Sequence, residues 1–346
     1  MRILVDAMGG DNAPDQIALG AIQAAKDFGC EVVLVGRGEA ILRALKDQGI
    51  ETLPKGVEIA NADDVVDMHD DPATVVKKKK DSSMVVGLNI LKEGGGDAFV
   101  SAGSTGALLS AATLTVRRVK GIRRAAMAPQ IPTKTGREAV LIDCGATADC
   151  TPEFLLQFAF MGSYYAEKVL GIENPRVALL NIGAEDSKGG ELQKAVYPLL
   201  KQAGETGAIN FTGNIEARDV PLGGADVIVA DGFSGNILLK GIEGTALFMA
   251  SMMKDMFKKN VLTKLAALLC MDGVKAFKKK MDYRETGGTA LIGLSKPVIK
   301  AHGSSDALAI RNAIRQAIGA VEADVAATLA ANMDHMVIPK EYQHAE

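Results

Sequence analysis

The chain has 346 residues, of which 48% are hydrophobic, so it can bury a large core as one large or two medium domains. Its formal net charge of -3 argues against a general nucleic-acid binder, because affinity for the phosphate backbone needs a large cationic footprint. Cys30, Cys144, Cys150 and Cys270 form no C-x-x-C pair. They therefore indicate neither a zinc site nor a disulfide framework, and free thiols fit a reducing cytoplasm.

Apolar runs alternate with amphipathic patterns along the chain. In chain order, the patterns predict strand 3–6, helix 15–28, strand 31–35, helix 73–92, strand 98–101, helix 105–119, strand 139–143, helix 151–170, strand 176–181, helix 191–203, and strands 227–230 and 297–300 before helix 304–331. Such alternation is typical of an α/β fold in which helices cover both faces of a largely parallel sheet. No composition shift marks a boundary, so we expect a single domain over 1–346 with 246–280 as a helical excursion.

The N-terminus reaches an aspartate after three apolar residues, and no segment has about 18 uninterrupted apolar residues. We therefore expect a protein that is neither secreted nor membrane-spanning.

Several strand patterns end in glycine and small polar residues. The loops are DAMGGDNAP from Asp6, SAGSTGA from Ser101, DCGATADC from Asp143, DGFSGN from Asp231 and AHGSSDA from Ala301. One such loop is usually a tight turn with a capped helix. Five loops at one edge of a sheet favour convergence on one anionic ligand, because helix N-termini there offer unpaired backbone N–H groups.

Two nucleotide-binding motifs are incomplete in this sequence. VGRGEAI supplies Gly36 and Gly38, but Ile41 stands at the third glycine position of G-x-G-x-x-G. NIGAEDSKGG has Lys188 and Gly189 in the reverse order from a P-loop, and no Ser or Thr follows. The sequence therefore favours neither a dinucleotide site nor a P-loop.

Five ordered motifs resemble those of PlsX-type phosphate acyltransferases from end to end of the chain: DAMGGDNAP, SAGSTGA, NIGAEDSKG, DGFSGN and HGSSDA. The resemblance implies transfer of a fatty acyl group from acyl carrier protein to inorganic phosphate, which gives acyl phosphate for phosphatidic acid and phospholipid synthesis. It also implies a three-layer α/β/α fold like that of isocitrate dehydrogenase and a homodimer. We expect neither a metal nor a cofactor. Ser104 and Thr147 stand where the family usually has Asn, and Ala217 stands where it usually has Gly. Serine and threonine keep a hydroxyl but lack the amide, so hydrogen bonds to the ligand should differ in detail from those of the family.

The implied reaction is attack of a phosphate oxygen on a thioester carbonyl. Phosphate is already a nucleophile near neutral pH, so the site needs an anion cradle and an oxyanion stabiliser rather than a strong base. Lys188, in a glycine-bounded loop, and Asn236, whose amide can donate to a carbonyl oxygen, are the catalytic candidates; a solvated lysine and a helix-capping asparagine are the structural alternatives. The residues expected to bind substrate or phosphate are Asp6, Gly9, Gly10, Ser104, Thr105, Asp231, Ser234, Gly235, His302, Ser304 and Ser305.

The sequence leaves two roles open. His302 is either a proton carrier or a polar group at a strand end. A covalent acyl-cysteine route would need an activated thiol, and only Cys144 lies at a strand end where one could be arranged.

Acyl carrier protein is acidic, so its docking surface should be basic. The segment 116–124, VRRVKGIRR, follows the helix of SAGSTGA, and we expect it close to the site as the docking surface, through Arg117, Arg118, Lys120, Arg123 and Arg124. The run KKKK at 77–80 competes with it, but consecutive lysines on a helix point all round and usually form a solvated face.

The segment 246–280 has too broad an apolar face for an ordinary surface helix. From Lys254 to Lys280 there are eight lysines against two aspartates, which gives a local charge of +6. It can lie on an anionic membrane through Leu262, Leu265, Leu268 and Leu269, or form a homodimer seam or the wall of an acyl groove. We expect a cytoplasmic, peripherally membrane-associated protein that supplies its labile product to a membrane glycerol-phosphate acyltransferase.

Two other functions remain as alternatives. A metal- or NAD(P)-dependent dehydrogenase on the related fold would need a carboxylate cluster and a nicotinamide site, which these motifs do not assemble. A non-enzymatic membrane-surface scaffold would form no acyl phosphate.

Overall fold

The computed structural model describes residues 1–280 and 282–338, and its strands form two sheets. The larger sheet has the order β3 (Val57–Asn61), β2 (Glu31–Gly36), β1 (Arg2–Asp6), β4 (Ala98–Ser101), β12 (Val298–Ala301), β11 (Gly288–Ile292) and β5 (Ala126–Ala128). The smaller has the order β6 (Gln130–Pro132), β7 (Glu138–Ile142), β10 (Val227–Val229), β8 (Arg176–Asn181) and β9 (Asn210–Glu216). Among the described strands, only β11 and β6 pair antiparallel to their neighbours, so the expected largely parallel α/β fold is confirmed.

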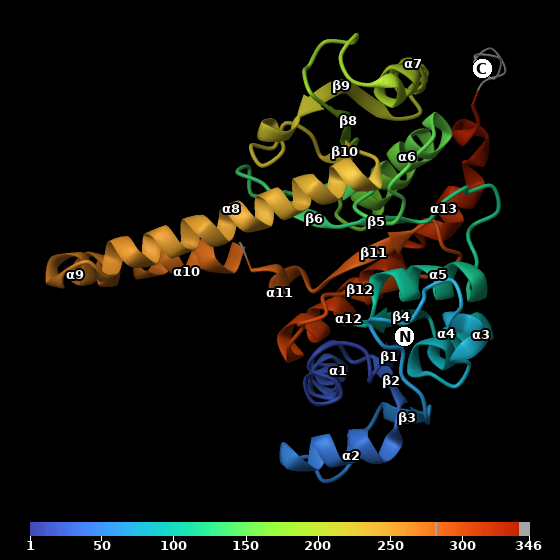
Figure 1. The fold of residues 1–346 in the computed structure, drawn as a ribbon, viewed down its shortest axis with the longest axis vertical. Helices are drawn as coiled ribbons and strands as arrows, with labels where there is room; N and C mark the ends of the chain where they lie inside the picture. The colour runs from blue at the N-terminus through green and yellow to red at the C-terminus, as the bar shows by residue number, and fades with distance from the viewer. Residues whose placement is uncertain (281, 339–346) are drawn as a thin grey trace.

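Helices cover both faces of the seven-stranded sheet (Figure 1). Ile3 and Val5 of β1 belong to the core beneath α1 (Asp15–Phe28) and α12 (Ala307–Ala323), whereas Leu4 points into the core beneath α4 (Ser83–Lys92) and α5 (Thr105–Thr115). Because successive side chains of a strand alternate between faces, an unbroken apolar run is required here. Helix α2 (Gly38–Asp47) lies beyond β3 at the outer edge of this sheet, whereas the short α3 (Val75–Lys78) lies beside α4 and α5.

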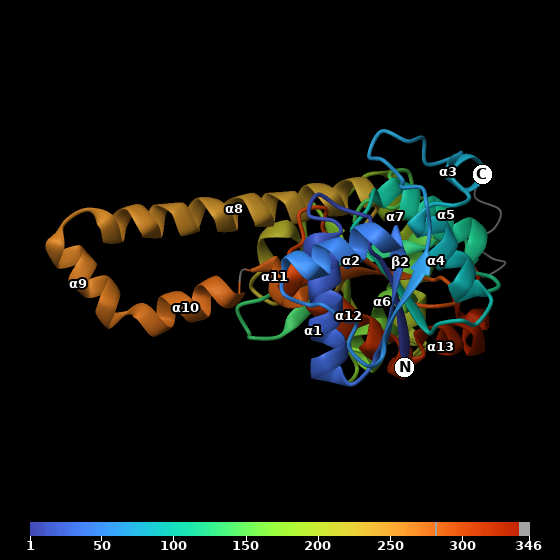
Figure 2. The same cartoon turned by 90° about the horizontal axis from the view of Figure 1, so that it is seen from below.

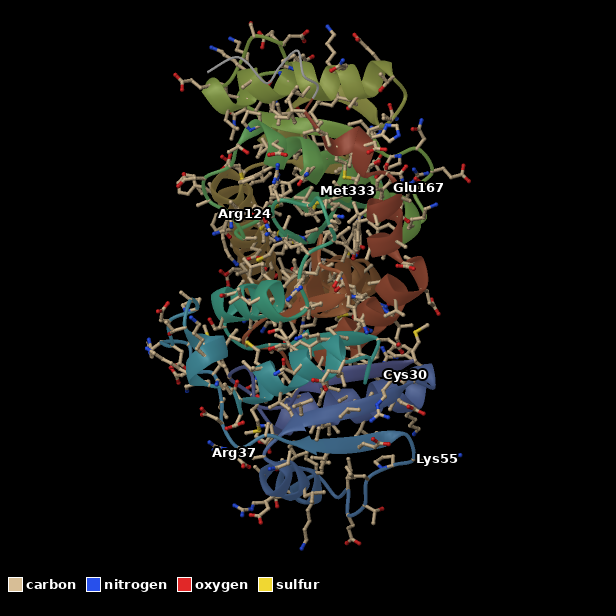
Figure 3. The ribbon with its side chains drawn as sticks, turned by 90° about the vertical axis from the view of Figure 1, so that its right-hand side faces the viewer. Cys30, Arg37, Lys55, Arg124, Glu167 and Met333 are labelled. Atoms are coloured by element: carbon tan, nitrogen blue, oxygen red, sulfur yellow. The ribbon has the colours of Figure 1, made fainter. Side chains whose placement is uncertain are left out.

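In the five-stranded sheet, α6 (Pro152–Lys168) and α7 (Glu191–Glu205) share the largest core with one face, and the first turns of α8 (Gly232–Lys258) cover the other. The two sheets meet where β5 runs almost directly into β6, with Pro129 between them. Figure 3 shows Arg37 and Lys55 near the outer end of the larger sheet, while Arg124, Glu167 and Met333 belong to the other half of the molecule.

An arm formed by α8, α9 (Val261–Leu269) and α10 (Met271–Lys280) projects from the body (Figures 1 and 2). The chain turns at α9 and returns through α10 to α11 (Tyr283–Thr286). Apolar side chains of α9 remain exposed, at 77% for Leu262, 56% for Leu265, 65% for Leu268 and 83% for Leu269. This arm contains the helical excursion expected over 246–280.

Two predicted helices are divided in the structure. Ser82 starts α4 inside the predicted helix 73–92, because its hydroxyl accepts the Val85 N–H at 3.4 Å. Asp324, in the left-handed region at φ 39°, separates α12 from α13 (Val325–Ala331) and caps α13 through the Ala327 N–H. The structure also contains α2 and strands β3, β5, β6, β9 and β11, which the apolar pattern did not reveal, and short 3₁₀ turns at Ala217–Asp219 and Met333–Met336.

Candidate functional site

Three loops meet at the carboxyl edge of the seven-stranded sheet, after the neighbouring strands β1, β4 and β12. The Asp11 N–H donates to the Gly303 carbonyl at 2.8 Å, and the Asn12 amide donates to two further carbonyls of the third loop at 3.1 Å each. Gly10 has φ +101°, and a Cβ there would lie 3.0 Å from the same Gly303 carbonyl oxygen, so glycine is required for the close approach. The structure thus brings eight predicted residues into this first cluster: Asp6, Gly9, Gly10, Ser104, Thr105, His302, Ser304 and Ser305.

Asp6 lies beneath the first cluster and is 1% exposed. Its carboxylate accepts from the Ser101 hydroxyl at 2.7 Å and from the Met8 N–H at 3.3 Å. Burial raises the pKa of Asp6, and hydrogen bonds from Ser83 and Ser101 oppose that rise. Asp6 therefore ties the first loop to the second from inside the protein.

Lys300, the third residue of β12, is a candidate that sequence reasoning missed. Its side chain is 7% exposed, and its Nζ donates to the carbonyl oxygens of Ala102, at 3.4 Å, and Ala301. Burial lowers the pKa of Lys300 to about 8, although the charges of Asp6 and Asp11 oppose the shift. The available signal was a lysine inside the apolar run PVIKA, which directly precedes HGSSDA.

The imidazole of His302 is held by the loop in which it lies. Its Nδ1 is 2.8 Å from the Ser304 hydroxyl and accepts the Ser304 N–H at 3.2 Å. Because Nδ1 accepts, a neutral ring carries its proton on Nε2. Desolvation and the positive charges of Lys300 and Lys240 lower the pKa of His302, so the ring is neutral at pH 7 and can donate from Nε2.

Helix α5 begins beside the first cluster. Ser104 is its N-cap residue, and the Ser104 side chain makes no capping hydrogen bond to the first turn. The Ser305 hydroxyl is buried and has no hydrogen-bond partner within the described part of the chain. Unpaired polar groups beside a helix N-terminus suit an anionic ligand.

A second cluster forms at the carboxyl edge of the five-stranded sheet, after β7, β10 and β8. The buried carboxylate of Asp143 orders the first of these loops by accepting four backbone N–H groups at 2.6–3.2 Å, from Met127, Cys144, Ala146 and Thr147. Helix α8 packs directly on this loop: the Gly232 N–H donates to the Thr147 carbonyl at 2.9 Å, and a Cβ on Gly235 would overlap the Asp143 carbonyl oxygen. Only glycine fits at Gly235.

Predicted residues of the second cluster have different surroundings. Asp231 caps α8 by accepting the N–H and the hydroxyl of Ser234, both at 2.8 Å. The side chain of Asn236 makes no hydrogen bond to the described residues, and its amide carbon lies 3.9 Å from the position that a Cβ on Gly145 would take. Lys188 lies in an exposed loop with its Nζ 4.0 Å from the Glu185 carboxylate, so it is weakly paired and accessible.

Helix α8 connects the two clusters. Asn236, Lys240 and Glu243 lie on one face of the helix, because their spacing is four and then three residues. Lys240 acts electrostatically on His302 of the first cluster and on Cys144 of the second. The expectation that all the loops share one edge of one sheet was therefore wrong, since they lie on two sheets with α8 between them.

The cysteines of the second cluster are poor nucleophiles. Cys144 is buried, and burial together with the charge of Asp143 raises its pKa to about 12. Burial also raises the pKa of Cys150 to about 12. Neither thiol lies in the electropositive setting that an activated cysteine needs.

The predicted docking segment lies away from the first cluster. Helix α5 has 11 residues, so it carries the chain about 16 Å from Thr105 toward the opposite edge of the sheet. There the Arg117 carbonyl accepts the Ser295 N–H at 2.9 Å, in the turn between β11 and β12. Arg123 and Arg124 instead reach the start of α6, where Arg123 pairs with Glu153 at 2.9 Å. Arg123 and Arg124 therefore lie near the loop that precedes α6 in the second cluster, and Arg117 lies away from the first cluster.

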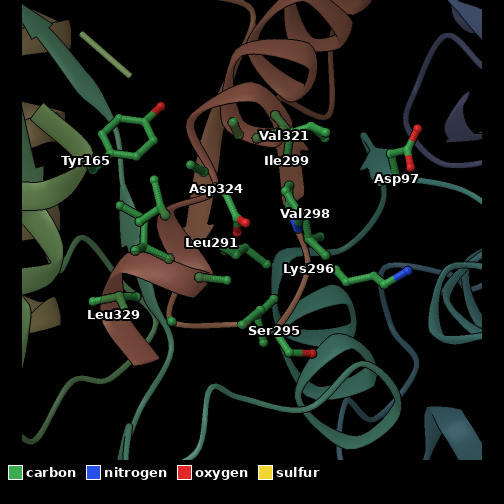
Figure 4. A pocket seen from close by; sticks show the side chains of 18 residues that line it. Asp97, Tyr165, Leu291, Ser295, Lys296, Val298, Ile299, Val321, Asp324 and Leu329 are labelled. Atoms are coloured by element: carbon green, nitrogen blue, oxygen red, sulfur yellow. The ribbon is translucent and has the colours of Figure 1, made fainter. Parts of the chain in front are cut away.

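One hollow of the structure lies apart from both clusters, and another lies beside the second cluster. A cavity of about 250 Å³ lies between the β11–β12 turn and the ends of α12 and α13, with Tyr165, Leu291 and Leu329 in its lining (Figure 4). It contains no residue of either cluster. An open hollow of about 430 Å³ lies beside the second cluster, between the loop after β7 and the starts of α7 and α8, and includes Asp231 and Phe233. The latter is the better placed to receive a substrate.

Within residues 1–280 and 282–338, no group of three or more His, Cys, Asp or Glu side chains could hold a metal ion. No helix in that same part of the chain is both long and apolar enough to span a membrane.

Residues 1–328 match the family model described as Fatty acid synthesis protein. The chain is 49% identical over 325 residues to a phosphate acyltransferase of Thermoanaerobacterium thermosaccharolyticum, with 94% of each chain covered. It is 46% identical over 335 residues to a phosphate acyltransferase of Bacillus cereus, with 96% of this chain and 98% of that protein covered.

Two solved structures are similar in fold. A phosphotransacetylase from Streptococcus pyogenes has a TM-score of 0.60 at 19% identity, with 93% of this chain and 94% of that chain covered. A branched-chain phosphotransacylase from Enterococcus faecalis has a TM-score of 0.55 at 15% identity, with 93% and 99% covered. At these identities the similarity establishes the fold alone.

Proposed function

The chain belongs to the fatty acid synthesis protein family that includes the phosphate acyltransferases, and we propose that it transfers a fatty acyl group from acyl carrier protein to inorganic phosphate. The product would be an acyl phosphate for phosphatidic acid and phospholipid synthesis. The observation that carries the proposal is the 46–49% identity to phosphate acyltransferases over most of both chains.

The reaction proceeds by direct attack. A phosphate oxygen forms a bond to the thioester carbonyl carbon, the carbon–sulfur bond breaks, and the carrier leaves as its thiolate, which takes a proton from solvent. Phosphate needs no strong base, so catalysis comes from placement and from hydrogen bonds to the developing oxyanion.

Polar groups of both clusters support this chemistry. The neutral His302 offers its Nε2–H, and Asn236, without a partner among the described residues, offers its amide from α8. Lys188 supplies an accessible positive charge from the loop after β8. The first cluster cradles phosphate through the start of α5, and the hollow at Asp231 and Phe233 receives the thioester arm.

The high pKa values of Cys144 and Cys150, about 12 for each, argue against a covalent acyl-cysteine intermediate. Few molecules would carry a thiolate at neutral pH, and no base lies in hydrogen-bond contact with either sulfur among the described residues.

Lys188→Ala and Asn236→Ala test the two catalytic assignments. Each should lower turnover at least about tenfold, a loss of about 1.4 kcal/mol of transition-state stabilisation, while the thermal midpoint changes little because both side chains are exposed. Turnover close to wild type in both variants would remove these residues from the mechanism.

Acyl carrier protein docks, in this proposal, on the basic segment 117–124. Charge reversal at Arg117 and Arg118 should raise the KM for the carrier thioester more than the KM for phosphate, and the effect should weaken with salt. Equal effects on both substrates would instead indicate a disturbed site.

The arm supports two further proposals. The exposed leucines of α9 and the local charge of +6 over residues 254–280 suit an anionic membrane surface. Exposed Leu247, Phe248 and Met252 on α8 form a candidate homodimer seam. A peripheral protein placed in this way would deliver a labile product to a membrane glycerol-phosphate acyltransferase.

A detergent-free assay for acyl phosphate tests the proposed function. Purified protein supplied with palmitoyl-acyl carrier protein and inorganic phosphate should form acyl phosphate without NAD(P) or an added divalent metal. Formation of no acyl phosphate, with binding to liposomes intact, would favour the membrane-scaffold alternative. A nicotinamide-dependent absorbance change would favour a dehydrogenase.

A further inference from the structure

We propose that Lys300 is a positioning residue for phosphate: its buried ammonium joins two loops of the first cluster and supplies the charge that lets those loops accept a dianion. This inference rests on the proposed function, because it concerns the phosphate that the proposed reaction consumes.

The geometry places the ammonium between the second and third loops. It donates to the carbonyls of Ala102, which follows β4, and Ala301, which ends β12. Ala102 lies three residues before Thr105, the first residue of α5, so the ammonium lies under the start of that helix. The positive end of the helix dipole and the ammonium therefore act on the same space.

The neighbouring charges show why a cation is needed there. Asp6 from β1 and Asp11 from the first loop act on Lys300, and the adjacent His302 is neutral at pH 7. Lys240 and Glu243 of α8 also act on His302 and offset one another through a 2.7 Å ion pair. The Lys300 charge therefore offsets the two carboxylates that would otherwise repel an incoming phosphate dianion.

Burial of this ammonium is costly, because its partners include only two carbonyls and no direct ion pair among the described residues. A methionine would fill a similar volume without that cost. Charged groups that are desolvated beside a ligand site are commonly functional, and Lys300 meets both conditions.

Steady-state kinetics of Lys300→Met test the inference, with Lys296→Met as the matched control. Lys296 precedes β12, and its Nζ also donates to a carbonyl, that of Gly96 at 3.4 Å, but at the opposite edge of the sheet. Near pH 7.5, Lys300→Met should raise the KM for phosphate at least about tenfold and change the KM for the acyl carrier thioester less than about twofold. Lys296→Met should change neither constant.

The pH dependence separates charge from packing. Because the ammonium titrates at about 8, the wild-type KM for phosphate should rise about eightfold between about pH 7.5 and 9, and the KM of Lys300→Met should stay flat. His302 is already neutral over that range, since its pKa is lowered from 6.5. An unchanged KM for phosphate in folded Lys300→Met, or the same alkaline rise in both proteins, would overturn the inference.

Calorimetry keeps the test valid if Lys300→Met does not fold. Wild-type affinity for inorganic phosphate should fall over the same pH interval, and Lys300→Gln should bind phosphate weakly at both ends of it. A wild-type protein that forms acyl phosphate but binds phosphate equally across the interval contradicts the Lys300 inference alone. A protein that binds phosphate with the expected pH dependence but forms no acyl phosphate contradicts the proposed function alone.

Discussion

Replacing Lys300 with methionine should stabilise the protein near neutral pH, and this gain should shrink as the pH rises. The folded-state pKa of Lys300 is lowered from 10.5 to about 8 by burial. Between those two values the unfolded state binds more protons than the folded state, so wild-type stability increases with pH. Below the folded pKa, the full penalty of burying the ammonium acts against folding, and methionine carries no such penalty.

The size of the effect follows from the two pKa values. At about pH 7 the buried ammonium lowers wild-type stability by about 3 kcal/mol relative to its neutral form. At about pH 9.5 this penalty is smaller by about 2 kcal/mol. The stability difference between Lys300→Met and wild type should therefore decrease by about 2 kcal/mol over that interval. This is large against the total stability of an ordinary domain.

Urea unfolding of both proteins at several pH values measures this difference, with Lys296→Met in parallel. The control should show a constant offset from wild type, because any other titrating group contributes equally to both curves. A constant offset for Lys300→Met as well would show that the ammonium is effectively solvated, which would refute the argument from burial. Higher stability combined with weaker phosphate binding in Lys300→Met is the result expected when a group is buried at a cost in stability for the sake of function.

Three other predictions follow from the site and the arm. Gly235→Ala should destabilise the protein by about 2 kcal/mol or more by steric overlap, whereas Gly241→Ala in the same helix, where a Cβ meets nothing within 4 Å, should leave the thermal midpoint equal or higher. Protonation of His302 would turn its accepting Nδ1 into a donor, so turnover should fall as the pH drops below the lowered pKa of His302. His302→Gln should lack this acid-side fall in the pH–rate profile; the same fall in both proteins would exclude His302 as its source. Leu265→Glu combined with Leu268→Glu should abolish flotation with anionic liposomes while the protein keeps its wild-type oligomeric state and activity, and a change of oligomeric state instead would identify α9 as an interface.

The loops of the site could be predicted from sequence because their signal is local. Glycine and small polar residues directly follow buried apolar runs, and this pattern located the ends of β1, β4, β10 and β12 to within a residue or two. Division of the strands into two sheets had no comparable signal. It depends on β5 and β6, which are three residues each and pair with strands distant in sequence.

Lys300 shows why burial could not be predicted from one strand. Its ammonium is enclosed by the loop at Ala102 and by residues near Asp11, which are about 200 and 290 positions away in the chain. The docking segment shows the opposite error. Sequence proximity to Thr105 suggested closeness to the first cluster, but α5 carries Arg117 to the other edge of the sheet.

Release of the carrier thiol in the presence and absence of phosphate tests direct attack most directly. The protein, at a concentration equal to that of palmitoyl-acyl carrier protein, is mixed with ¹⁸O-labelled inorganic phosphate or with phosphate-free buffer, and free thiol and acyl phosphate are measured together. Direct attack predicts no thiol release without phosphate, and with phosphate an acyl phosphate that retains all four labelled oxygens. A stoichiometric burst of thiol without phosphate would reveal an acylated enzyme and contradict the proposed mechanism.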